Sequence, residues 1–100
     1  MSKLETRHVE IVNRKGLHAR ASARLAELAR TLPTRVMILF DGEHADARSI
    51  MDLLCLGAGI GSQVELIANG NDANAALDAI TALINDGFGE MSEDKPAEPE

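Results

Sequence analysis

The sequence predicts an α+β fold, an open-faced two-layer sandwich in which a four-stranded antiparallel sheet is covered on one face by three helices. Two observations predict it. Stretches in which apolar and polar residues alternate are interleaved with stretches in which apolar residues recur every three or four positions. Their order along the chain is β-α-β-β-α-β-α. One-sided strands and striped helices pack as two layers, leaving the other face of the sheet in water.

The strand pattern covers four segments, which are bounded by turn signals. Strands are expected over residues 4–12, 34–40, 43–47 and 63–68. Asp41-Gly42 predicts a tight hairpin turn between the second and third strands, and Asn69-Gly70 predicts a turn after the fourth. His8 alternates with apolar neighbours in the first strand, so it is expected to face solvent.

The helix pattern also has clear starts and stops. Helices are expected over residues 18–32, from Ser49 to the glycine at 57, and from Asp72 to Gly87. The apolar stripes of the two longer helices are Ala21, Leu25, Leu28 and Leu32, and Ala73, Leu77, Ile80 and Ile84. Ser49 predicts an N-cap for the short helix, and Phe88 is expected to fold back on the core after the last one.

Length and charge divide the chain into two parts. A chain of 100 residues suits one domain with a modest core. The formal charge is −6, and −4 of it falls in residues 90–100, which contain five acids and one base. We expect a folded domain over residues 1–89 and a disordered acidic tail over residues 90–100, because the tail has too few apolar residues to bury.

The composition argues against nucleic acid and membrane partners. The chain is acidic and has only two aromatic residues, so its bases have no stacking platform beside them. It has neither an apolar run of about 18 residues nor an apolar core near its start that would indicate a signal peptide. The single cysteine, Cys55, fits a reducing compartment. We therefore expect a cytoplasmic protein.

No metal or other cofactor is expected. His44 has no cysteine or second histidine at ligand spacing. The glycines at 57, 59 and 61 follow a helix and precede a strand, whereas a nucleotide-binding loop needs the reverse order. We interpret this glycine-rich segment as a flexible connection.

His18 lies where the first strand pattern gives way to a helix pattern. The first turn of a helix leaves N–H groups without intrahelical partners and carries partial positive charge. Such a place attracts anions and disfavours a cationic imidazole. A phosphoryl group on the His18 ring would meet these N–H donors and the guanidinium of Arg20. Histidine near a helix start is also common, and Gly16 alone indicates only a turn, so the pattern by itself leaves both interpretations open.

Basic residues cluster in sequence around His18, namely Arg14, Lys15, Arg20 and Arg24. Such a patch would steer acidic partners or a phosphate-bearing site toward His18. An ordinary solvated face of charges is the alternative interpretation.

Two separated motifs resemble those of HPr, the histidine phosphocarrier of the bacterial phosphoenolpyruvate-dependent phosphotransferase system. Residues 16–20 read GLHAR, and residues 48–51, some thirty positions later, read RSIM and are followed by Leu56-Gly57. The resemblance runs from about residue 9 to residue 84. It implies the strand order 1-4-2-3, which periodicity cannot supply.

The resemblance also implies a function. His18 would accept a phosphoryl group on Nδ1 from phospho-enzyme I and pass it to A components of sugar permeases or to regulatory proteins. Arg20 would neutralise the phosphate, and the backbone N–H groups of Ala19 and Arg20 would donate to it, with Gly16 giving the bend and the room. Such a carrier has no turnover of its own and is therefore not an enzyme. We expect a monomer, because a carrier docks successive partners through one face.

Further residues match regulatory and docking positions of the family. Ser49 matches the serine that HPr kinase/phosphorylase phosphorylates in some bacteria, a role compatible with an N-cap. Ile50, Met51 and Leu54 match or adjoin the apolar docking patch, to which we add Arg24. Core packing is the alternative, favoured for Leu54 more than for Met51, since neighbouring helix positions cannot all face inward.

The chain departs from the family pattern at two positions. Ala21 stands where many members have proline, and Lys15 stands where some have a polar amide. We expect both to tune transfer without abolishing it. Two other functions remain open: a nitrogen-related regulatory paralogue, whose relay imports no sugar, and a non-catalytic interaction module that uses residues 50–51 without needing His18.

Overall fold

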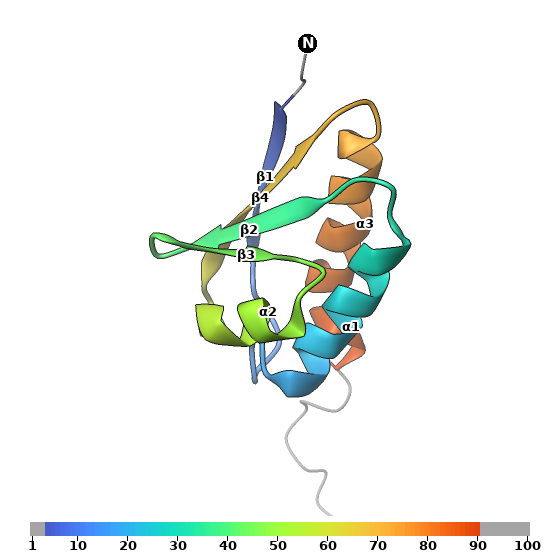
Figure 1. Ribbon diagram of the computed structural model, residues 1–100. Coiled ribbons are helices and arrows are strands. Elements are labelled where there is room, and N and C mark those ends of the chain that lie inside the picture. Colours follow the sequence, from blue (N-terminus) through green and yellow to red (C-terminus); the bar gives the residue numbers. More distant parts are fainter. Residues whose placement is uncertain (1–3, 91–100) are drawn as a thin grey trace, which may run out of the picture.

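The computed structural model describes residues 4–90, and its elements follow the predicted order (Figure 1). They are β1 (Leu4–Glu10), α1 (Ala19–Thr31), β2 (Val36–Phe40), β3 (Glu43–Asp46), α2 (Ile50–Leu56), β4 (Gln63–Asn69), α3 (Ala73–Asn85) and the short 3-10 helix η1 (Gly87–Gly89). The predicted acidic tail, apart from Glu90, lies outside the described residues.

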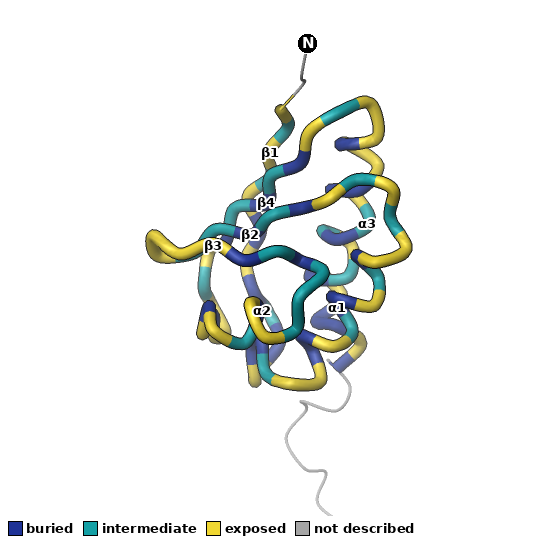
Figure 2. The backbone as a smooth tube through the Cα atoms, in the orientation of Figure 1, coloured by how far each residue is buried: buried dark blue, intermediate teal, exposed yellow. Residues whose placement is uncertain are grey.

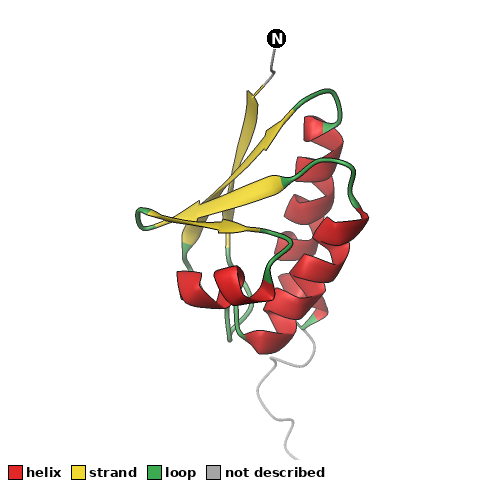
Figure 3. Ribbon diagram, viewed as in Figure 1, coloured by secondary structure: helices red, strands yellow, loops and turns green. Residues whose placement is uncertain are grey.

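The four strands form one antiparallel sheet in the order β1-β4-β2-β3, as the resemblance implied. Alternate residues of the sheet face the helices and are buried, for example Val36 and Ile38 in β2 and Val64 and Leu66 in β4. Figure 3 shows the helices gathered on one side of the strands. The predicted α+β open-faced sandwich is therefore confirmed.

The core lies between the sheet and the inward stripes of α1 and α3, which run side by side to the right of the strands in Figure 2. The whole predicted stripe of α3 is buried. Of the predicted first helix stripe, Ala21 and Leu25 are buried, while Leu28 and Leu32, the C-cap residue of α1, are partly buried against the core. No helix within residues 4–90 combines the length and the apolar character that crossing a bilayer requires.

The predicted hairpin turn joins β2 and β3. Asp41 and Gly42 both adopt positive φ, 53° and 81°. Two successive left-handed residues are the geometry that matches the twist of paired strands in a two-residue hairpin, and Asp-Gly is one of the pairs that adopts it readily.

The glycine-rich segment after α2 is held more firmly than a flexible connection would be. Gly57 takes the left-handed conformation that closes α2. The next residues bond to the loop that follows β1: Gly61 N–H donates to Ile11 O at 2.7 Å, and Leu17 N–H donates to Ala58 O at 2.9 Å. The prediction of a flexible connection was therefore wrong. The glycines indicated backbone conformational freedom, but the hydrogen-bond partners that restrict it lie more than 40 residues away in the sequence. We call residues 57–62 the glycine loop.

Candidate functional site

His18 is the N-cap residue of α1, as its place in the sequence predicts. Its backbone is extended, and the first bond of the helix runs from Ser22 N–H to His18 O at 2.8 Å. The N–H groups of Ala19, Arg20 and Ala21 therefore precede the first intrahelical bond. The His18 side chain is 26% exposed. The imidazole thus lies at the N-terminus of α1 and is partly exposed to solvent.

Gly16 fixes the approach of the chain to His18. Its φ is +64°, and a Cβ built on it would lie 2.5 Å from Ala58 O and 2.6 Å from Gly59 Cα. Only glycine fits there, because any side chain would meet backbone atoms and would also disfavour the left-handed conformation. The close approach expected of Gly16 is therefore made to the glycine loop, which also accepts the hydrogen bond from Leu17 N–H.

Glu90 differs most from its expected place. The sequence assigned it to the solvated tail, but its side chain is fully buried against the site. Glu90 Oε2 lies 2.7 Å from His18 Nε2 and 3.3 Å from Arg20 Nε, and Oε1 accepts a bond of 2.9 Å from Asn13 Nδ2. The assignment of Glu90 to the tail was wrong. The acidic residues after it suggested a solvated tail, but the three groups that contact its carboxylate belong to Asn13, His18 and Arg20, which are distant in sequence.

Asn13 is the second residue that sequence reasoning missed. It is fully buried, and its Nδ2 group donates to both Glu90 Oε1 and Gly16 O, each at 2.9 Å. In the sequence it stands between Val12 and the basic residues Arg14 and Lys15, which carries no signal of burial; once buried, its amide needs partners. Asn13 joins the Gly16 bend to the Glu90 carboxylate.

The basic residues near His18 have different surroundings. Arg14 and Lys15 are exposed, and Arg20 keeps 45% of its side chain exposed while contacting Glu90. Arg24 is partly buried and donates through Nη1 to Phe88 O. Arg24, which we grouped with the docking residues, therefore also fastens the turn that carries Glu90.

Ser49 is the N-cap of α2, as predicted. Its Oγ accepts a hydrogen bond of 3.1 Å from Asp52 N–H. The preceding Arg48 donates to Leu32 O at 2.9 Å, which ties this cap to the end of α1. The start of α2 is thus a well-anchored position on the surface of the fold.

The residues expected in the apolar docking patch are not equally exposed. Met51 is 67% exposed, whereas Ile50 and Leu54 are partly buried and Ile50 packs against the core. Ile60 in the glycine loop is a further large apolar side chain at the surface, 60% exposed. Helix α2 contacts α1, and the start of α1 lies at the same end of the molecule as α2 (Figure 1).

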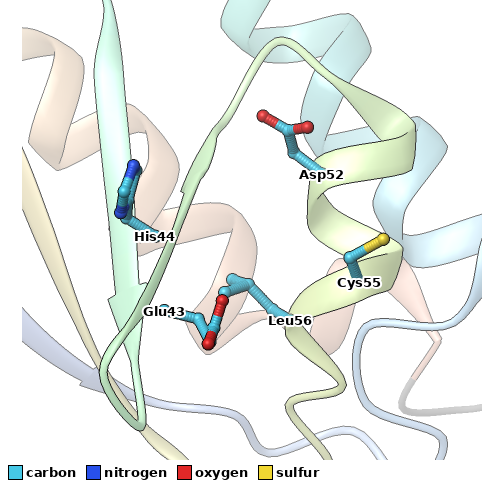
Figure 4. Close-up of a pocket in the computed structure, with 5 residues that line it drawn as sticks. All are labelled: Glu43, His44, Asp52, Cys55 and Leu56. Atoms are coloured by element: carbon cyan, nitrogen blue, oxygen red, sulfur yellow. The ribbon is translucent and has the colours of Figure 1, made fainter.

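A surface pocket between β3 and α2 contains several polar side chains outside the His18 site. It is lined by Glu43, His44, Asp52, Cys55 and Leu56 (Figure 4). Although these residue types include metal ligands, no group of three or more His, Cys, Asp or Glu side chains in the described chain is placed to hold a metal ion.

A family model and the similar proteins of known sequence all indicate the same protein family. Residues 5–86 match the family model described as PTS HPr component phosphorylation site. The phosphocarrier protein HPr of Cupriavidus necator is 48% identical over 84 residues, covering 84% of this chain and 94% of that protein. The phosphocarrier protein NPr of Shewanella violacea is 46% identical over 92 residues, covering 92% of this chain and all of that protein.

Solved structures agree with the sequence relatives. The crystal structure of HPr from Thermoanaerobacter tengcongensis superposes with a TM-score of 0.81 at 35% identity, covering 86% of this chain and 97% of that one. HPr from Bacillus anthracis superposes with a TM-score of 0.77 at 31% identity, covering 81% of this chain and 96% of that one. With its sheet order, its histidine at the opening of α1 and these relatives, the chain belongs to the HPr family of phosphocarrier proteins of the phosphotransferase system.

Proposed function

We propose that this protein carries a phosphoryl group on His18 Nδ1, accepting it from phospho-enzyme I and passing it to A components of permeases or to regulatory proteins. The observation that carries the proposal is the partly exposed His18 ring at the opening of α1 in a chain of the HPr family. The proposal includes a cytoplasmic location, with which the lone Cys55 is compatible.

The surroundings of His18 suit a carrier. The N–H groups of Ala19 and Arg20 precede the first intrahelical bond and so belong to the helix start, where phosphoryl oxygens are favoured. Arg20 would add a charge-assisted donor. Transfer in both directions requires moderate binding of the phosphoryl group, because a carrier that held it too tightly would not release it.

The test is incubation with enzyme I, phosphoenolpyruvate and Mg²⁺, followed by intact-mass measurement. The wild type should gain one acid-labile phosphoryl group, and His18→Ala should gain none. His8→Ala is the matched control, because His8 is an exposed histidine on the opposite face of the sheet. An unmodified wild type at saturating enzyme I, or a His18→Ala variant that is still modified, would refute the proposal and leave the interaction module.

Both branches of the family are represented among the similar proteins. The HPr and NPr relatives have nearly equal identity to this chain, 48% and 46%, so identity does not assign the branch. The choice is tested by comparing initial rates of phosphorylation by enzyme I of the sugar system and by its nitrogen-related paralogue. The donor that phosphorylates His18 faster identifies the branch.

Docking is proposed to use the exposed apolar surface of α2. Met51 supports this role because it is 67% exposed on a helix that contacts α1. Met51→Asp should slow phosphorylation by enzyme I. Leu4→Asp is the matched control, since Leu4 is 64% exposed in β1. Equal rates for the two variants would exclude Met51 from the docking surface.

Ser49 is proposed as a second, regulatory phosphorylation site. Its support is the family motif and its place at a helix start, where added negative charge is electrostatically favourable and need not unfold the helix. An active HPr kinase/phosphorylase with ATP should add an acid-stable phosphate to the wild type and none to Ser49→Ala. Failure with an active kinase would leave Ser49 with the capping role alone.

A further inference from the structure

The Glu90 side chain is a buried acid for which the phosphocarrier scheme above has no role. Its relative exposure is 0%, and its two oxygens face three donor groups from Asn13, His18 and Arg20. A buried carboxylate is costly unless it is paired and hydrogen-bonded. This one is both, and two of its partners are the residues expected to handle the phosphoryl group.

The hydrogen-bond network places the proton of the His18 ring. Asn13 Nδ2 and Arg20 Nε are groups that only donate, and they face Oε1 and Oε2 respectively. Arg20 and Glu90 form an ion pair, and the oxygens of an ionised carboxylate only accept. The 2.7 Å contact between Oε2 and His18 Nε2 is therefore a bond donated by Nε2–H. A neutral imidazole with its proton on Nε2 has its lone pair on Nδ1.

We propose that Glu90 is a positioning residue for phosphoryl transfer: by accepting the bond from His18 Nε2–H it fixes the tautomer and the orientation in which Nδ1 is the nucleophile. This inference rests on the proposed function. It follows the general logic by which a carboxylate behind a histidine sets which nitrogen reacts.

The same contact serves both directions of the relay. In the forward step the Nδ1 lone pair forms a bond to the phosphorus of a phosphohistidine on the donor protein, and the donor's N–P bond breaks with its electrons returning to the donor ring. The His18 ring then carries the phosphoryl group on Nδ1 and its proton on Nε2, so the ring is an imidazolium facing the Glu90 carboxylate. When the phosphoryl group leaves, the Nδ1–P electrons return to Nδ1. No proton has to move at Nε2 in either step.

The turn that follows α3, residues 87–90, places the Glu90 carboxylate beside His18. Gly87, Phe88 and Gly89 have positive φ of 64°, 58° and 76° in succession. A left-handed Phe is unusual, and such conformations persist where the surroundings determine them. Here the Phe88 ring is fully buried, its carbonyl accepts from Arg24, and Glu90 N–H closes the turn by donating to Gly87 O at 2.9 Å.

The first experiment reads the tautomer directly, without any phosphoryl donor. Protein labelled with ¹⁵N in its histidines is examined by long-range ¹H–¹⁵N NMR at a pH where the rings are neutral. In the wild type, His18 Nδ1 should resonate as an unprotonated nitrogen and Nε2 as a protonated one. Glu90→Ala removes the acceptor at Nε2, so the two tautomers mix and the two His18 ¹⁵N shifts should move toward each other. Glu90→Gln has this effect only where its NH₂ group, and not its carbonyl, faces Nε2.

The second experiment measures the initial rate of phosphorylation by enzyme I. Loss of the hydrogen-bond partner that orients a metal-binding histidine typically lowers affinity or activity about 10-fold to 100-fold, and by analogy we expect a fall of that order for the Glu90 variants. The backbone amide spectrum checks that each variant is folded. Glu65→Gln is the matched control: Glu65 Oε2 lies 3.8 Å from His8 Nε2 on the exposed side of the sheet, so the variant should leave the His18 shifts and the rate unchanged.

The outcomes separate this inference from the proposed function. Shifted ¹⁵N resonances with a slower rate in folded Glu90 variants support it. Unchanged ¹⁵N shifts in Glu90→Ala overturn it, even with a slower rate, because the slower rate would then come from structure alone. A wild type that enzyme I never phosphorylates refutes the carrier function, whereas the NMR result would still show whether Glu90 sets the tautomer.

Discussion

His18 and His8 each face a glutamate, but only one of the two pairs is built into the fold. At His18 the oxygen of a fully buried Glu90 lies 2.7 Å from Nε2, and at His8 the Glu65 oxygen lies 3.8 Å from Nε2 of a side chain that is 71% exposed. Exposed pairs contribute little, because water screens them and the side chains stay mobile. The comparison teaches that burial of the acid, with its other donors, distinguishes a pair that is part of the packed fold from an exposed neighbour.

The same contrast extends to the regions around the two pairs. We call the loop of residues 11–18, the glycine loop and η1 with Glu90 the site end, and the solvent side of the sheet with its β2–β3 hairpin the open face. Each region contains a left-handed glycine and a large apolar side chain. At the site end Gly16 and Phe88 are buried, whereas on the open face Gly42 and Leu4 are exposed. Matched substitutions in the two regions test how far packing makes the difference.

The largest effect is expected at Phe88. Phe88→Ala should lower the free energy of unfolding by roughly 3–5 kcal/mol, because it removes a fully buried aromatic ring and leaves a cavity. Leu4→Ala should change little, since Leu4 is 64% exposed. Urea unfolding followed by circular dichroism measures both. Similar losses for the two variants would show that η1 is not an integral part of the core.

Gly16 and Gly42 provide the next comparison. Both have positive φ, but a Cβ on Gly16 meets the backbone of residues 58–59, while a Cβ on Gly42 has nothing within 4 Å. Gly16→Ala should therefore cost roughly 3 kcal/mol, combining the left-handed penalty with a steric clash. Gly42→Ala should cost about 1 kcal/mol from the left-handed penalty alone. Urea unfolding of the pair would contradict this account if Gly42→Ala proved the more damaging variant.

Glu90 and Glu65 sharpen the contrast between the two histidine pairs. Glu90→Ala should destabilise the fold by about 1–3 kcal/mol, because the buried Asn13 amide loses an acceptor. Glu65→Ala should have an effect within about 0.5 kcal/mol, as is usual for surface positions. The measurement is thermal unfolding at neutral pH. A Glu90 variant as stable as the wild type would mean that the carboxylate adds no net stability at the site end.

The smallest effect is expected at the helix caps. Ser49 Oγ accepts a bond from Asp52 N–H, whereas the side chain of Asp72, at the N-cap position of α3, makes no capping bond. Ser49→Ala should cost about 1 kcal/mol, and Asp72→Ala should cost less. Because the expected difference is small, chemical unfolding at closely spaced urea concentrations is the suitable measurement. The reverse order would contradict the hydrogen-bond geometry.

Local sequence patterns predicted most of the fold, because the type of each helix, strand and turn is determined mainly by residues close to it in the sequence. The Asp41-Gly42 turn and the α3 stripe each depend on residues within one or two turns of the chain, and both appear where expected. The place of His18 at a helix start was predicted in the same way, from its position before a helical stripe, whereas the resemblance supplied its expected role. Strand order could not be obtained locally, because β1 and β4 pair across more than 50 residues, and the resemblance supplied it.

Glu90 could not be predicted because its contacts are among the longest in sequence. Its partners Asn13 and His18 are 77 and 72 residues away, and periodicity carries no information over that distance. Its neighbours beyond residue 90 are acidic, so composition pointed to a tail. The prediction of a flexible glycine loop was wrong for a related reason. Glycines indicate backbone conformational freedom, and the hydrogen bonds that restrict the loop come from residues 11–17, far away in the sequence.

The pairing of Asn13 with Glu90 also bears on how the protein is made. Domains form as units while the ribosome extends the chain from its N-terminus. When β1 and α1, which flank His18, have left the ribosome, Glu90 has not yet been synthesised, so its contact with the imidazole cannot form. This end of the molecule is therefore completed only when translation has passed residue 90, among the last steps of synthesis for the described fold.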